Sequence, residues 1–155
     1  CEDDLLDTAK AILAKAKAQG VKLYLPVDGS VVKEVAADAP FVYKSVQEFC
    51  DDDKGVDIGP ATRLLYAEVL SDCGTIVWNG PMGIFEMEAF AQGTVDVALA
   101  VAESKALTIV GGGDTDAAVH KAGVLDKIDF VSTAGGAFLE MLGGHELPGV
   151  KALED

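Results

Sequence analysis

The stretch Leu107–Thr115 reads as a buried strand that passes through three glycines into a helix. Its first four residues are apolar or β-branched, which is typical of a strand buried on both faces. After the glycines, either Asp114 or Thr115 can cap a helix that the following alanines favour. The stretch therefore predicts a strand that is joined to a helix by a turn without side chains.

Such a turn suits a phosphate group. Glycine lets the backbone approach the ligand, the free N–H groups of a helix N-terminus point outward, and the helix dipole adds partial positive charge. A single glycine turn can equally be a tight connection in which Asp114 only caps the helix. Further turns of the same kind must agree before a ligand is inferred.

Apolar periodicity and glycine or proline breaks divide the chain into alternating helices and strands. The predicted helices are Glu2–Gln19, Ala61–Leu70, Gly93–Glu103, the segment after Gly113 to about Ala122, and one beginning at Phe138. The predicted strands are Val21–Val27, Thr75–Trp78, Leu107–Val110 and Lys127–Val131. Asp28-Gly29 and Asp51–Gly55 are predicted turns, the second a solvated one, and residues 29–54 form either two short strands or an excursion. Strands separated by helices predict an α/β fold with a parallel sheet and right-handed crossovers.

Three of the predicted strands end in polar, glycine-rich turns: Asn79–Gly83, Gly111–Gly113 and Thr133–Gly136. In a parallel sheet these turns lie on one edge, at the carboxyl ends of the strands, where ligands of open α/β sheets bind. Three successive turns of this kind indicate a phosphorylated or nucleotide ligand.

Charge limits what this ligand site can contain. The 155 residues carry a formal net charge of -14, which argues against nucleic acid or an anionic membrane as a partner. There is no Lys or Arg between Arg63 and Lys105, or between Lys105 and Lys121. Bound phosphates would therefore need Mg²⁺ at Asp114 and lysines from elsewhere, so part of the site is expected to be missing.

The remaining composition favours one domain in a reducing compartment. Half of the residues are hydrophobic, enough for a core, while no segment is long and apolar enough to span a bilayer and none resembles a signal peptide. The three cysteines have no CxxC spacing and predict ordinary thiols in the cytosol, and the two histidines lack the spacing of a zinc site. We expect a cytoplasmic protein.

Two familiar phosphate-binding loops do not match. Gly111–Thr115 lacks the Gly-Lys-Ser/Thr end of the Walker P-loop, and Asp116 stands where the dinucleotide motif G-x-G-x-x-G has its third glycine. The sequence also lacks an acidic residue near the expected ribose position of a dinucleotide dehydrogenase. A dehydrogenase domain is therefore disfavoured.

Three long motifs strongly resemble the phosphoglycerate kinase family in order and spacing: Trp78–Glu86, Gly111–Thr115 and Ser132–Ala137. Leu23–Asp28, Asp57–Pro60 and Leu147–Val150 fit as well, so the resemblance covers nearly the whole chain. Residues 29–54 match least, and Ala134 stands where the family often has a third glycine. The resemblance implies a Rossmann-like three-layer αβα fold with a parallel sheet, incomplete in this fragment.

The resemblance also implies a role for each site residue. Members transfer a phosphoryl group between 1,3-bisphosphoglycerate and ADP, giving 3-phosphoglycerate and ATP in glycolysis, and their C-terminal domain binds Mg²⁺ with ADP or ATP. Asp114 would hold Mg²⁺, and Glu86 would accept hydrogen bonds from the ribose hydroxyls. The adenine and ribose slot would be lined by Val56, Gly80, Pro81 and Ile84. The transferring phosphate would face Asn79, the amides around Gly112, Gly113 and Thr115, and Gly135 and Gly136, with Gly113 and Gly136 in catalytic positions.

For some of these residues a purely structural role remains open. Val56 and Ile84 can be core residues, Glu86 can be a solvated acid, and Trp78 is expected to pack and not to contact the ligand. For Asp114 and Glu86 we favour the functional interpretation.

We expect the chain, which begins at Cys1, to be part of a longer protein that is monomeric when intact. The resemblance implies that residues 1–155 are part of a C-terminal nucleotide-binding domain, without the phosphoglycerate domain and without the first part of the nucleotide domain. Two absent strands would then separate Val21–Val27 from Thr75–Trp78. We therefore expect no kinase activity from this chain alone. The alternative is a stand-alone nucleotide-binding module with a regulatory or scaffolding role.

Overall fold

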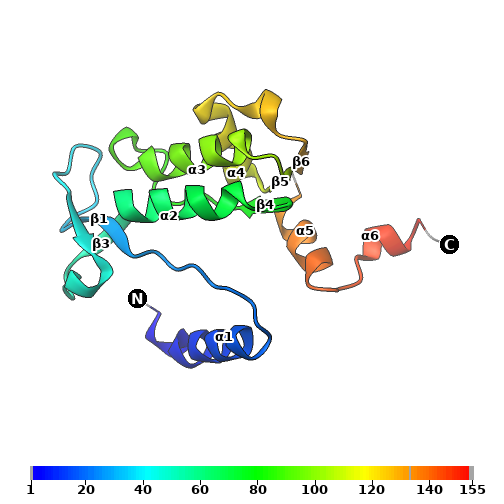
Figure 1. Cartoon of the computed structure of the whole chain (residues 1–155), viewed down its shortest axis with the longest axis horizontal. Helices are drawn as coiled ribbons and strands as arrows, with labels where there is room; N and C mark the ends of the chain where they lie inside the picture. The colour runs from blue at the N-terminus through cyan, green and yellow to red at the C-terminus, as the bar shows by residue number, and fades with distance from the viewer. Residues whose placement is uncertain (1, 133, 154–155) are drawn as a thin grey trace.

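A parallel sheet of three strands carries the central stretch of the sequence. The computed structural model describes residues 2–132 and 134–153, so Cys1 and Thr133 lie outside the described residues. The strands pair in the order β4-β5-β6 and comprise β4 (Thr75–Asn79), β5 (Leu107–Gly111) and β6 (Phe130–Ser132). Figure 1 shows three helices side by side next to them: α2 (Pro60–Ser71), α3 (Gln92–Glu103) and α4 (Gly113–Ala122). The predicted α/β class and parallel sheet are confirmed.

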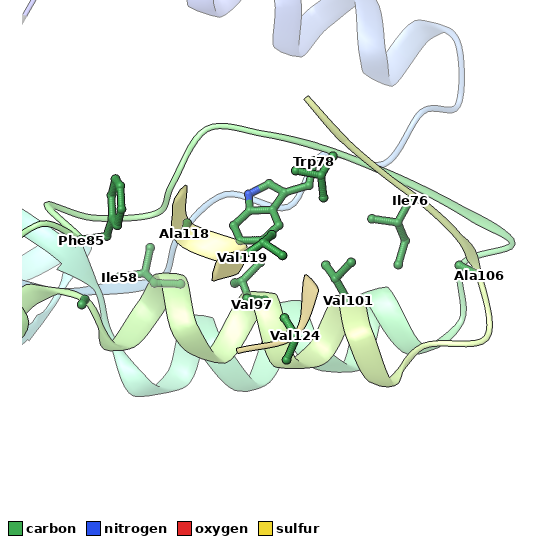
Figure 2. Packing of buried hydrophobic residues seen from close by; sticks show 13 residues of the cluster. Ile58, Ile76, Trp78, Phe85, Val97, Val101, Ala106, Ala118, Val119 and Val124 are labelled. Atoms are coloured by element: carbon green, nitrogen blue, oxygen red, sulfur yellow. The ribbon is translucent and has the colours of Figure 1, made fainter. Parts of the chain in front are cut away.

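The core lies between one face of this sheet and the three helices. Ile76 and Trp78 are buried and belong to one cluster with Val97 and Val119 of the helices (Figure 2). Val110 of β5 is buried in the same cluster. Because side chains alternate along a strand, the neighbouring strand residues point to the other face. There Val77, Leu107 and Phe130 are 42%, 45% and 62% exposed. One helical layer is therefore in place, whereas the opposite face of the sheet is largely bare, in agreement with an incomplete three-layer fold.

A second sheet is antiparallel and has the order β2-β1-β3. Its strands are β1 (Asp28–Val32), β2 (Val42–Ser45) and β3 (Lys54–Ile58). Two short strands in residues 29–54 were one of the two predicted possibilities, and this possibility is correct. The prediction of a turn at Asp28-Gly29 is wrong, because these residues begin β1 and pair with β2 and β3.

The predicted solvated turn at Asp51–Gly55 is only partly correct. Residues 51 and 52 form a turn, but β3 begins at Lys54. The side chain of Asp53 is 1% exposed and pairs with Lys33 and Lys44, whose Nζ atoms lie 2.8 and 2.6 Å from its carboxylate oxygens. This cluster joins the loop between β2 and β3 to the rest of the sheet.

The predicted strand at Val21–Val27 is wrong. The segment has no strand assignment, and Val21, Leu23 and Leu25 are 54%, 46% and 59% exposed. A β-prone sequence forms a strand only when a neighbour completes its hydrogen bonds, and no strand among the described residues pairs with this one. The segment leads from α1 (Leu6–Ala18), which follows a short 3₁₀ turn at Asp3–Leu5. In Figure 1 α1 lies apart from the other helices, and none of its residues is buried.

The remaining elements follow the predicted order with shifted boundaries. The predicted strand Lys127–Val131 begins only at Phe130, because Leu125–Lys127 forms a 3₁₀ turn. The last predicted helix begins earlier, at Gly135, and the chain then forms α5 (Gly135–Leu142) and α6 (Pro148–Lys151), with further 3₁₀ turns at Val46–Glu48 and Glu88–Phe90. Among the described residues, no helix is both long and apolar enough to cross a membrane.

Candidate functional site

Thr115 joins the first two glycine-rich turns. Its hydroxyl accepts a hydrogen bond from the N–H of Gly80 at 2.7 Å and donates one to the carbonyl of Gly111 at 2.9 Å. The same carbonyl accepts a second hydrogen bond, 2.7 Å long, from Nδ2 of Asn79. Thr115 is 1% exposed, so these bonds are shielded from water. The ends of β4 and β5 are therefore held together at the carboxyl edge of the sheet.

The third turn packs directly on the second. The N–H of Gly112 donates to the carbonyl of Ser132 at 3.0 Å. A Cβ atom on Gly135 would lie 2.8 Å from Cα of Gly112, so a side chain at Gly135 would collide with backbone. Gly112 has a φ of +97°, which L side chains rarely adopt. Glycine is thus required here by close approach of two backbones and by backbone conformation.

Two helices begin at this junction. α4 starts at Gly113 and α5 at Gly135, so Gly113, Asp114 and Gly136 all lie in first helical turns. The N–H groups of a first turn have no partner inside the helix, and the helix dipole places partial positive charge there. Gly113, Asp114 and Gly136 are exposed. The junction therefore presents unpaired amides to solvent at two helix N-termini.

The residues fit a magnesium ion that is shared with a phosphorylated ligand. The carboxylate of Asp114 makes no hydrogen bond or ion pair with any described residue, and no cluster of three or more potential metal ligands occurs in residues 2–132 and 134–153. Mg²⁺ is commonly held by one or two carboxylates together with substrate phosphates and water, not by a cage of protein groups. A single free carboxylate beside exposed amides is such a donor set.

A second part of the candidate site lies where the turn after β4 meets β3; this turn comprises residues 80–86 and is called the 80–86 turn. Here Val56, Pro81 and Ile84 line a cavity of about 320 Å³, and the N–H of Ile84 donates to the carbonyl of Val56 at 2.9 Å. Val56 is 2% exposed and packs with Val32 and Phe90, so it is also a core residue.

The structure brings the predicted residues together in two groups. Asn79, Gly80, Gly112, Thr115 and Gly135 meet at the junction of the turns, and Gly80 leads from there toward the cavity. Val56, Pro81 and Ile84 meet at the cavity.

Glu86 joins neither group through a contact of its own. It is exposed, and its carboxylate has no partner among the described residues. Trp78 is buried and donates from Nε1 to the carbonyl of Gly80 at 2.7 Å. It thus packs beneath the turn, as predicted.

Sequence reasoning missed three residues that hold the 80–86 turn. Asp57 is 9% exposed, and its carboxylate accepts a hydrogen bond from the N–H of Gly93 at 2.6 Å. Burial raises the pKa of Asp57, and the hydrogen bonds from Gly93 and Ile58 oppose that shift. Thr94 accepts the N–H of Met82 at 3.1 Å. Nζ of Lys121 donates to the carbonyl of Phe85 at 2.6 Å. Only Asp57 gave a signal, since an acid between apolar residues of a strand implies a buried partner.

The fold and the turns define a class of protein: a parallel α/β domain in which strand-to-helix turns meet at helix N-termini, the usual location of ligands in such sheets. Within this class, the chain belongs to the phosphoglycerate kinase family. The family model "Phosphoglycerate kinase" matches residues 1–145.

Individual relatives agree with this assignment. Phosphoglycerate kinase of Citrifermentans bemidjiense is 55% identical over 154 residues, and that of Aquifex aeolicus is 53% identical; each match covers 99% of this chain and 39% of the relative. The solved structure of the Coxiella burnetii enzyme superimposes with a TM-score of 0.92 at 48% identity over 97% of this chain, and the Pyrococcus horikoshii enzyme with 0.83 at 35%. The chain spans about 39% of the length of the curated relatives it matches.

Proposed function

We propose that residues 1–155 are part of the C-terminal, nucleotide-binding domain of a phosphoglycerate kinase. The intact protein would transfer a phosphoryl group reversibly between 1,3-bisphosphoglycerate and ADP, giving 3-phosphoglycerate and ATP. The observation that carries this proposal is the meeting of three glycine-rich turns around Thr115 and Gly112, beside two helix N-termini. Family membership selects this reaction among those that a phosphate site could serve.

The phosphates are assigned to the junction of the turns. Amides of Gly113 and Thr115 and the side chain of Asn79 would face the transferring phosphate, with Gly135 and Gly136 at the second helix N-terminus. Gly112, whose own N–H is bonded to Ser132, would let the backbone come close to the phosphate. Asp114 would hold Mg²⁺, which supplies charge neutralisation and orientation of the phosphates when bound. Because phosphoryl transfer depends on positioning and charge stabilisation and needs no nucleophilic side chain, we assign the backbone amides at Gly113 and Gly136 to catalytic positions.

The nucleoside is assigned to the cavity beside β3. The adenine and ribose slot would be lined by Pro81, Ile84, Val56 and Gly80, because the 80–86 turn runs from the phosphate junction to the cavity. Glu86 follows on the same turn, and its carboxylate, which has no partner among the described residues, can accept hydrogen bonds from the ribose hydroxyls. A cavity at one end of this turn and exposed amides at the other suit a nucleotide, which has an apolar base and charged phosphates.

The binding site for the phosphoglycerate substrate is assigned to a part of the protein outside this chain. The lack of Lys or Arg in the glycine-rich turns and the share of the relatives that is spanned, 39%, support this division of labour. We propose that the intact protein is a cytoplasmic monomer with no nucleic acid or membrane partner, and that this chain by itself does not catalyse the transfer.

Calorimetric titration with Mg-ADP tests the proposal. The wild-type chain, folded by circular dichroism, is expected to bind Mg-ADP, and binding should weaken strongly in Asp114→Ala or when EDTA removes Mg²⁺. Asp126→Asn is the matched control, because Asp126 is an exposed acid in the 3₁₀ turn that precedes β6, whereas the glycine-rich turn follows that strand. A folded wild type that does not bind, or an Asp114→Ala variant that binds as tightly as wild type, contradicts the assignment. ATP formation by the 155-residue chain contradicts the division between domains.

A further inference from the structure

The carboxylate of Asp57 lies between two glycines that cannot be replaced without displacing it. A Cβ atom on Gly83 would lie 2.5 Å from Oδ1 of Asp57, and a Cβ atom on Gly93 would be closer still to the same oxygen. Gly83 belongs to the 80–86 turn, and Gly93 to the first turn of α3. The side chain of Asp57 therefore fills the space where β3, the turn and α3 meet.

Hydrogen bonds fix this carboxylate and, through it, the turn. Oδ2 accepts the N–H of Gly93 at 2.6 Å, and Oδ1 accepts the N–H of Ile58 at 2.8 Å. The next residue of α3, Thr94, is 1% exposed and accepts the N–H groups of Met82 and Gly83 at 3.1 and 3.4 Å. A chain of contacts thus runs from Asp57 through the start of α3 to the turn.

The turn that is held in this way is the one that borders the cavity. Asp57 itself lines the cavity together with Val56, Pro81 and Ile84. Ile84 is also bound to the carbonyl of Val56, the residue before Asp57. Two neighbouring residues of β3, Val56 and Asp57, therefore lie directly against the turn.

We propose that Asp57 is a positioning residue for the nucleoside end of the ligand: its carboxylate sets the distance between the 80–86 turn and β3, and so the width of the slot. This inference rests on the proposed function, which assigns the adenine and ribose to that slot. The hydrogen bonds of Asp57 go to Ile58 and Gly93, whereas the phosphate end is organised by Thr115, Asn79 and Gly112.

The separation of the two ends gives a selective test. Asp57→Asn keeps the size of the side chain but replaces one acceptor oxygen by an NH₂ group, so one N–H donor loses its partner. We expect Mg-ADP affinity to fall roughly tenfold, because the loss of one hydrogen bond inside the protein to a charged group lets the turn shift and changes the width of the slot. Mg-pyrophosphate lacks the nucleoside and does not need the slot, so its affinity should stay within about twofold of wild type. Asp126→Asn, which removes the same charge at an exposed position, should change neither affinity.

A second variant keeps the test decisive if Asp57→Asn does not fold. Gly83→Ala leaves the charge intact but places a methyl group against the carboxylate, and it should show the same selective loss of Mg-ADP. Hydrogen exchange provides a readout without ligand: the amide of Ile84 should exchange faster in both variants, whereas the amide of Gly112 should be unchanged.

Each other outcome is informative. Equal weakening of Mg-ADP and Mg-pyrophosphate, with faster exchange at Gly112 as well, means that Asp57 only stabilises the fold, and it overturns the inference. Unchanged Mg-ADP affinity overturns it too while leaving the proposed function intact. A wild-type chain that binds Mg-pyrophosphate but not Mg-ADP refutes the nucleotide assignment itself, and the inference with it.

Discussion

Replacing Thr115 by valine removes the hydroxyl that joins two of the three turns while keeping the shape of the side chain. Two hydrogen bonds are lost, one from the N–H of Gly80 and one to the carbonyl of Gly111. The carbonyl retains its bond from Asn79, whereas the Gly80 amide loses the partner that the structure gives it. Leaving one such shielded donor unpaired costs about 2 kcal/mol.

Thermal unfolding followed by circular dichroism measures this cost. For a chain of this length, about 2 kcal/mol corresponds to a fall in Tm of roughly 4–8 °C. Thr115→Ser keeps the hydroxyl and should lose only the contribution of one methyl group, about 1 kcal/mol. Thr75→Val, the same change at an exposed position of β4, should stay within about 0.5 kcal/mol of wild type. Equal Tm values for Thr115→Val and wild type, or equal losses for the valine and serine variants, would refute the role assigned to the hydroxyl.

Two further predictions concern the two glycines at the start of α5 and the loss of thermal stability at low pH. Gly135→Ala should lower the free energy of unfolding by about 1–3 kcal/mol, because the added Cβ atom meets Cα of Gly112. In Gly136→Ala the added Cβ atom meets nothing within 4 Å, so the Tm should be unchanged or higher. Thermal unfolding of the two variants checks this difference. Lys33 and Lys44 hold the pKa of Asp53 well below its usual range. This cluster therefore stabilises the fold at pH values above the pKa of Asp53 in the unfolded chain, about 4, and the stabilisation is lost as the pH falls toward the lower pKa of Asp53 in the folded protein. Tm should therefore drop below about pH 4, and Asp53→Asn should flatten that drop; an equally steep acid limb in the variant would contradict the reasoning.

The parallel sheet could be predicted from the sequence because its signals are local. The apolar run Leu107–Val110 is bounded by glycines, and Gly93–Glu103 has a helical stripe, so element type and order follow from periodicity. The meeting of the turns also follows, since parallel strands place their carboxyl ends on one edge. The hydroxyl of Thr115 as the joining group could not be predicted, because it depends on the distance between two turns 35 residues apart.

The failures have a different cause, since they concern segments whose structure depends on partners distant in the sequence. Val21–Val27 has a good strand composition, but strand formation requires a neighbour, and none pairs with it among the described residues. Asp28-Gly29 has a turn composition, but pairing with β2 and β3 makes it a strand. The position of Asp57 between apolar residues of a strand indicates burial, but only the tertiary structure shows that its carboxylate lies against Gly83 and Gly93.

The most direct test of the account is the location of the bound nucleotide. In an ¹⁵N-labelled chain titrated with Mg-ADP, we expect amide signals to shift at the junction of the turns, above all at Gly80, Gly113 and Gly135, and at Ile84 beside the cavity. The larger hollow of about 750 Å³ between α2 and α3, which includes Arg63 and Leu99, serves as the internal comparison and should not respond. Shifts confined to that hollow, with no change at Gly113 and Gly135, would contradict the central claim that the glycine-rich turns form the nucleotide site.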